Sequence, residues 1–87
     1  MSTTIKQIET LKKGDYIEAS ELYYKVIRVK TKCQTITLTP PFRYGEKATG
    51  REWTSKYNDM ISKIDFQYWN IIRKNNPKAK GIEGKVK

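Results

Sequence analysis

A basic segment between residues 23 and 51 holds the side chains with the clearest chemistry in this sequence. Its seven cations outnumber its single acid, Glu46, so the segment carries +6 of the chain's formal net charge of +9. The cations are Lys25, Arg28, Lys30, Lys32, Arg43, Lys47 and Arg51, and the aromatic residues Tyr23, Tyr24, Phe42 and Tyr44 lie among them. Basic side chains interleaved with aromatic ones are typical of surfaces that bind polyanions, most often nucleic acid.

Residues 42–51 are the first candidate surface within this segment. The Tyr44 ring is suited to stack on an unpaired base, while Arg43 and Arg51 contact the backbone of the same strand. In the alternative interpretation, Phe42 packs into the core and the remainder is an ordinary exposed loop.

Few residues are available for catalysis or metal binding. The chain has no histidine, which is the commonest general base and metal ligand, and its one cysteine, Cys33, cannot build a zinc site. The acids Asp15, Glu18 and Glu21 lie near expected turns, and we interpret them as solvated turn acids. We therefore predict a protein that is not an enzyme and has no cofactor.

The length of the chain allows one small domain with a thin core. No apolar run approaches the roughly 18 residues that a membrane span needs, and a lone cysteine excludes an internal disulfide. The first ten residues lack the apolar core of a signal peptide. These observations predict a cytoplasmic protein without a membrane partner.

Strand patterns dominate the middle of the chain. Residues 22–32 are rich in β-branched and aromatic side chains, and residues 34–39 alternate strictly, with Ile36 and Leu38 on one face. Together they predict a hairpin, which the Pro40-Pro41 pair ends. Further short strands are expected at residues 16–19, 52–57 and 60–64.

The polar face of this hairpin is the second candidate surface. Thr35, Thr37 and Thr39 point away from the apolar face, and Arg28, Lys30 and Lys32 are expected to lie across from them. In that arrangement the cations neutralise phosphates and the hydroxyls bond phosphate oxygens. The alternative is an ordinary solvated sheet face, kept basic to prevent edge pairing.

The two ends of the chain have weaker patterns. Residues 3–11 predict a helical turn, and residues 66–74 predict a short helix capped by Asp65, although the same residues also fit a strand. From Asn75 onward the composition becomes polar and basic, which predicts a disordered tail. The expected organisation is a single domain at residues 1–74 followed by a flexible basic tail at residues 75–87.

Residues 11–29 carry a family resemblance. The sequence Leu-Lys-Lys-Gly-Asp-Tyr-Ile-Glu at 11–18, followed by Tyr-Tyr-Lys-Val-Ile-Arg-Val at 23–29, resembles the small SH3-like barrels, which include the KOW modules and the first domain of elongation factor P. The resemblance implies a mainly β fold, a small barrel of about five short strands, and a leaning towards RNA, DNA or nucleoprotein partners. The glycines that follow the entry to the second strand in KOW motifs are absent here.

Two functions are compatible with these features. The first is a non-enzymatic nucleic-acid-binding module, directed largely at the phosphates of RNA or DNA. Its expected contact residues are Lys25, Arg28, Lys30, Lys32, Arg43, Tyr44, Lys47 and Arg51. The second is a small regulator, of the kind common in phages and mobile elements, that docks on a larger protein or nucleoprotein through Trp53 or Trp69.

Overall fold

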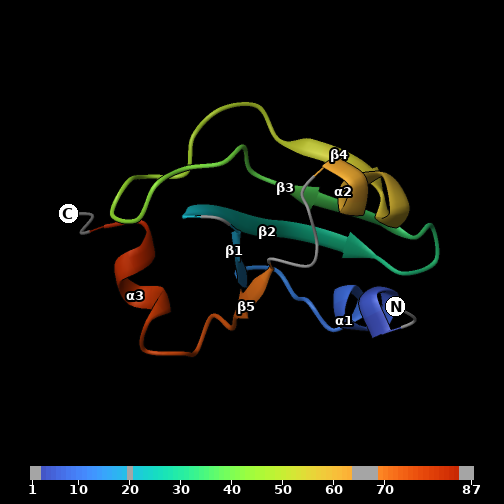
Figure 1. Cartoon of the computed structure of the whole chain (residues 1–87), viewed down its shortest axis with the longest axis horizontal. Coiled ribbons are helices and arrows are strands. Elements are labelled where there is room, and N and C mark those ends of the chain that lie inside the picture. The colour runs from blue at the N-terminus through green and yellow to red at the C-terminus, as the bar shows by residue number, and fades with distance from the viewer. Residues whose placement is uncertain (1–2, 20, 64–68, 85–87) are drawn as a thin grey trace.

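The structure is a computed structural model, and it describes residues 3–19, 21–63 and 69–84. Within these ranges the elements are α1 (Thr3–Glu9), β1 (Tyr16–Ala19), β2 (Leu22–Lys30), β3 (Thr35–Leu38), β4 (Trp53–Lys56), α2 (Tyr57–Lys63), β5 (Asn70–Ile72) and α3 (Ala79–Ile82). The strands are antiparallel and form one open sheet in the order β4-β3-β2-β1-β5 (Figure 1). The expected mainly β class is confirmed.

The long strand β2 organises the sheet. Its first half pairs with β1, where Ala19 lies opposite Leu22, and its second half pairs with β3, where Lys30 lies opposite Thr35. The register shifts between Val26 and Arg28, as at a β-bulge, and a bulge bends a strand and increases its twist. β2 ends two residues before the predicted position, because residues 31–34 form the hairpin turn.

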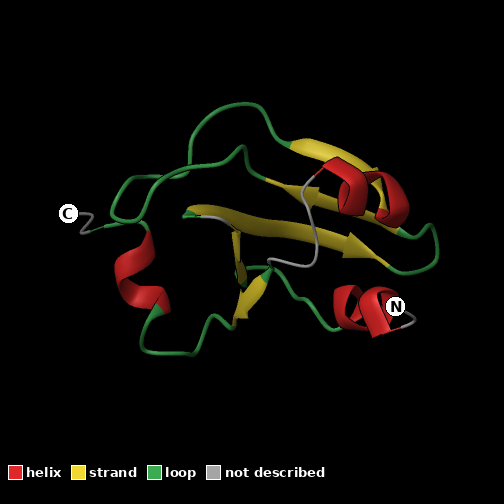
Figure 2. Ribbon diagram, in the orientation of Figure 1, coloured by secondary structure: helices red, strands yellow, loops and turns green. Residues whose placement is uncertain are grey.

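The main core lies between one face of the sheet and the helices α1 and α2. Ile36 and Leu38 are fully buried there, as their alternation predicts, and they meet Ile8 from α1 and Met60 from α2. Figure 2 shows α1 and α2 near the same end of the strands, with α3 at the opposite end. Among the described residues, every helix is too short or too polar to cross a membrane.

A second, smaller core lies against β1, β2 and β5 and is covered by α3. It contains Tyr16, Tyr23, Phe42, Ile72, Ala79 and Ile82. Backbone hydrogen bonds in both directions join Tyr23 and Phe42, at 2.8 and 3.0 Å, and hold the loop after β3 against β2. The alternative in which Phe42 belongs to the core is therefore confirmed.

The predicted strand at residues 60–64 was wrong for residues 60–63, which belong to the helix α2. Tyr57 and Met60, three residues apart, both bury their side chains in the main core. That spacing places both residues on one helical face. Residue 64 lies outside the described residues.

The predicted helix at residues 66–74 was wrong for residues 70–72, which form β5. This strand pairs with the edge of β1, with Ile72 opposite Tyr16, and it buries Ile72 in the second core. Pairing with an exposed strand edge gives backbone N–H and C=O groups of both strands their hydrogen-bond partners. The local sequence of residues 70–72 does not reveal that such an edge is nearby. Residues 69, 73 and 74 are not helical either, and the alternative strand is confirmed at residues 70–72, while residues 66–68 lie outside the described residues.

The prediction of a disordered tail from Asn75 was wrong for residues 75–84. The helix α3 buries Ala79 and Ile82 against the sheet, and Glu83 follows it. The two apolar side chains of Ala79 and Ile82 are enough to hold α3 against the sheet, because Lys78 and Glu83 beside them form ion pairs with Glu18 and Lys25. Residues 85–87 lie outside the described residues.

Glu83 anchors α3 to the sheet. Its Oε2 accepts a hydrogen bond from Tyr16 Oη at 2.5 Å and lies 3.1 Å from Lys25 Nζ, while its Oε1 accepts from Ala48 N at 3.4 Å. Burial acts to raise the pKa of Glu83, but the bonds from Tyr16 and Lys25 and the charge of Lys25 outweigh it. The pKa therefore lies below its usual 4.5.

We expect Glu83→Gln to lower the free energy of unfolding by about 1 kcal/mol at pH 7, since a charged acceptor is lost but an amide oxygen remains. Because the folded-state pKa lies below the unfolded value of 4.5, the stabilisation is complete above that pH and is lost as the pH falls through the folded value. Urea unfolding of both proteins at neutral and acid pH measures this. A difference that stays constant into strong acid would contradict the role of the carboxylate.

Candidate functional site

The outer face of β2, β3 and β4 holds a cleft of about 250 Å³, lined by Arg28, Lys30, Thr35, Thr37 and Thr54. The strand register builds it, because Arg28 lies opposite Thr37 and Lys30 opposite Thr35. Thr54 on β4 lies opposite Thr37 on its other side. We call this feature the threonine cleft.

The two cations of the threonine cleft differ from Lys25 in their lack of a described ion-pair partner. Arg28 and Lys30 are exposed, and neither forms an ion pair with any residue that the structure describes. Thr37 forms the floor of the cleft, being only 4% exposed, and its Oγ1 is hydrogen-bonded to Thr54 Oγ1 at 2.9 Å. Cations above a floor of hydroxyls form a suitable receptor for an oxyanion.

The three threonines of β3 and its end are less accessible than the sequence predicts. Thr37 and Thr39 are buried, and Thr39 Oγ1 accepts a hydrogen bond from Lys25 N at 3.0 Å. Thr35 remains half-buried and available. Of the three threonine hydroxyls that the sequence predicts at the surface, only that of Thr35 remains accessible. Thr54 on β4, which is exposed, adds a further hydroxyl to the cleft.

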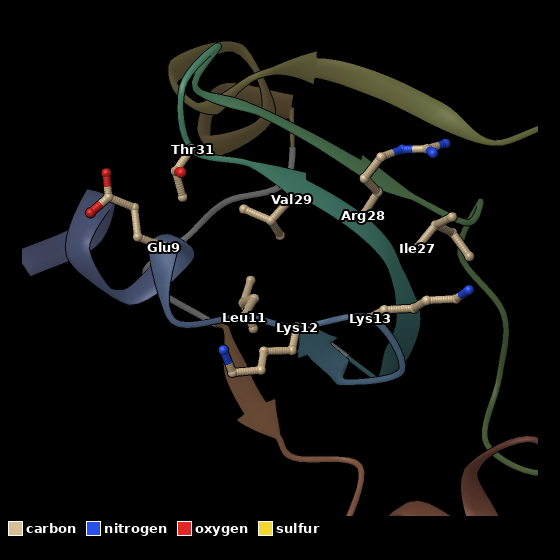
Figure 3. Close-up of a pocket in the computed structure, with 8 residues that line it drawn as sticks. All are labelled: Glu9, Leu11, Lys12, Lys13, Ile27, Arg28, Val29 and Thr31. Carbon is tan, nitrogen blue, oxygen red and sulfur yellow. The ribbon is translucent and has the colours of Figure 1, made fainter.

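A second depression lies between β2 and the segment that joins α1 to β1 (Figure 3). It has a volume of about 460 Å³, and we call it the β2-edge groove. It is lined by Glu9, Leu11, Lys12, Lys13, Ile27, Arg28, Val29 and Thr31. Leu11 and Val29 point towards each other across it, and Arg28 lines both this groove and the threonine cleft.

The predicted contact residues of the loop lie elsewhere. Gly45 N donates to Ile82 O at 2.7 Å, so the part of the loop with Arg43, Tyr44 and Lys47 lies beside α3. Figure 1 shows α3 at the opposite end of β2 from the hairpin turn. β2 has nine residues, so at a rise of about 3.3 Å per residue its two ends, one near α3 and one at the hairpin turn, are roughly 26 Å apart.

The predicted residues therefore fall into two groups. Arg28 and Lys30 share the threonine cleft, and Lys32 is exposed in the adjoining turn. Lys25 is engaged by Glu83 on the side of α3. Arg43, Lys47 and Arg51 are exposed in the segment between β3 and β4.

Tyr44 has partners within the protein although it is 54% exposed. Its ring meets that of Tyr23 edge-on, with centroids 5.7 Å apart, and its hydroxyl lies close to Gly81 of α3. One side of the ring is therefore occupied by the fold.

The tryptophans expected to anchor a protein partner also contact the fold. Trp53 is half-buried, with its ring 6.1 Å from that of Tyr24 and Lys63 Nζ 4.2 Å above its centre. Trp69 is half-buried and packs against the main core.

Sequence reasoning missed Lys12, Lys13 and Ile27 as groove residues. The two lysines lie outside the basic segment at residues 23–51. Two adjacent lysines indicate a local concentration of positive charge, which the sequence shows. Their position beside β2 depends on the fold and could not be predicted from the sequence.

Within the described part of the chain, no three acidic, cysteine or histidine side chains form a group that could hold a metal ion. Cys33 is exposed in the hairpin turn. Comparison with protein-family models, with curated proteins and with solved structures finds no match to this chain.

Proposed function

We propose that this chain is a non-enzymatic nucleic-acid-binding module that holds phosphate groups of RNA or DNA at the threonine cleft. The observation that carries the proposal is the pairing of exposed, uncompensated Arg28 and Lys30 with the threonine hydroxyls across the strand. Guanidinium and ammonium groups neutralise phosphates, and hydroxyl groups donate to phosphate oxygens. Such contacts position a nucleic acid without reading its sequence.

The distribution of ion pairs supports this location. The ion pairs among the described residues engage Lys25, Arg73 and Lys78, all near β1, β5 or α3. The cations around Arg28 have no such partner in the described residues. Arg43, Lys47 and Arg51 likewise have no ion pair with the described residues, but the second half of β2 adds threonine hydroxyls that can bond phosphate oxygens.

The fold proposed with this function is an SH3-like barrel in a cytoplasmic protein. In its support, β2 pairs with a different strand through each half and has a bulge between them. A strand that bends in this way can belong to two sheets that pack on each other. The resemblance at residues 11–29 points to the same class.

The salt dependence of binding tests the proposal. If Arg28 and Lys30 neutralise two phosphates, the logarithm of the association constant should fall with the logarithm of salt concentration with a slope of roughly −2 for duplex DNA. Fluorescence anisotropy with a labelled duplex at several salt concentrations measures the slope. Binding of unchanged strength between low and moderate salt would count against phosphate contacts.

A protein partner is the second candidate, favoured by the exposed Tyr44 with Arg43 and Lys47 in the same loop. Tyrosine and arginine are common in the energetic centres of protein interfaces. A pull-down from lysate with and without nuclease separates the two candidates. A defined protein that survives nuclease treatment, and that is lost with Tyr44→Ala, would favour this second function.

A further inference from the structure

Ile27 lies at the bulge of β2 and does not belong to either core. It is half-buried, and it is not among the side chains that form or pack against the two hydrophobic clusters. Instead it lines the β2-edge groove together with Leu11 and Val29. A bulge redirects the side chains around it, and here it leaves an isoleucine available to a ligand rather than to the core.

The backbone beside this groove is also incompletely paired. On the side of β1, pairing extends as far as Val26, whose N donates to Asp15 O at 2.8 Å and whose O accepts from Gly14 N at 2.9 Å. Among the described residues, no strand pairs with this edge of β2 beyond Val26. Backbone groups of an unpaired edge are free to bond a ligand with polar edges.

Charge gives the groove a direction. In Figure 3 the side chains of Lys13 and Arg28 extend at one end, whereas Glu9 lies at the other end and the side chain of Lys12 extends toward it below Leu11. A phosphate is attracted most strongly to the end with Lys13 and Arg28, because the carboxylate of Glu9 offsets the charge of Lys12 at the other end. Leu11 and Val29 between the two ends, with Ile27 beside the two cations, form an apolar surface that suits a flat, weakly polar group attached to that phosphate.

We infer that the β2-edge groove receives an unpaired base of a single-stranded nucleic acid, whose phosphate lies on Arg28 between the groove and the threonine cleft. This inference rests on the proposed function and adds the class of nucleic acid. The base is held between the aliphatic side chains, and the strand continues over Lys30. A duplex cannot use the groove, because its bases are already stacked and paired.

The test compares a labelled single strand of about 12 nucleotides of mixed sequence, which is within usual site sizes, with an RNA duplex of equal length at the same ionic strength. We expect the single strand to bind roughly tenfold more tightly. Ile27→Ala should weaken single-strand binding by about tenfold and duplex binding by less than about twofold, since the buried methylene groups contact only the unpaired base. Ile61→Ala, which removes the same atoms from α2, serves as the matched control and should change neither.

Duplex binding also reports that the Ile27→Ala protein is folded. Equal affinity for single strand and duplex, with no effect of Ile27→Ala, would overturn the inference and leave the proposed function intact. An equal loss for both ligands would also overturn it, because it would assign Ile27 a structural role. Failure of the unmodified protein to bind either ligand would overturn the proposed function itself.

Discussion

Replacing Arg28 and Lys30 together by glutamate should weaken nucleic-acid binding by about a hundredfold or more at low salt. The double variant exchanges two attractions for two repulsions at the proposed phosphate site, and such contacts provide most of the affinity of a phosphate-directed protein. Both side chains are exposed and lack ion pairs with the described residues, so the change should have little effect on folding. Anisotropy titration with the same labelled oligonucleotide measures the loss.

The matched control is the double variant Arg43→Glu with Lys47→Glu. It makes the same change in formal charge, from +9 to +5, but places it in the loop beside α3. We expect a loss of less than about fivefold, because the charge is distant from the threonine cleft and exposed charges are screened by salt. Equal losses in the two variants would show that only total charge matters, and a larger loss in the control would move the site to the loop.

The sheet could be predicted where the information is local. Tyr16–Ala19 was predicted to the residue, and the alternation around Ile36 and Leu38 correctly identified the buried face of β3. Arg28 was also predicted to lie across from the threonines, because a hairpin fixes its own register. These features depend on neighbours within about a dozen residues.

The features that the sequence did not reveal depend on distant partners. Residues 70–72 become a strand because they meet the edge of β1, and α3 docks because Tyr16 and Lys25 hold Glu83. In the same way, Lys25 looks like a binding residue in the sequence, although the structure pairs it with an acid far along the chain. The groove at Ile27 exists only because the segment after α1 folds against β2.

The acids in the described part of the chain pair with some of its cations and not with others. Glu18 is close to Lys78 at 3.7 Å and accepts from Asn70 Nδ2 at 3.1 Å, while Glu83 holds Lys25. These acids are used to attach the last segment of the chain to β1 and β2. The attachment engages Lys25 and Lys78, whereas Arg28 and Lys30 on β2 and the loop cations Arg43, Lys47 and Arg51 have no ion pair with the described residues.

Asp15 is the acid whose removal should destabilise the fold most. It is 3% exposed, and its Oδ2 accepts from Lys12 N at 2.9 Å and from Arg73 Nη1 at 3.2 Å, while its Oδ1 accepts from Lys74 N at 3.0 Å. The interpretation of this residue as a solvated turn acid was therefore wrong. One carboxylate joins the turn before β1 to the segment after β5, which lie far apart in the sequence.

We expect Asp15→Ala to lower the free energy of unfolding by about 2–4 kcal/mol, because two backbone N–H groups lose their acceptor in a partly buried place. A domain of this length has a total stability of roughly 4–13 kcal/mol, so the loss is a large fraction. Urea unfolding followed by circular dichroism measures it.

Two further variants separate the causes of this loss. Asp15→Asn keeps one carbonyl oxygen for one of the backbone groups and should cost roughly half as much. Arg73→Ala removes the ion pair and the hydrogen bonds that Arg73 donates to Thr10 O and Oγ1, at 3.1 and 2.9 Å, but the arginine side chain is 45% exposed, so we expect a loss of about 1 kcal/mol or less. If Arg73→Ala cost as much as Asp15→Ala, the contacts of the arginine rather than the two backbone hydrogen bonds to Asp15 would hold these segments together.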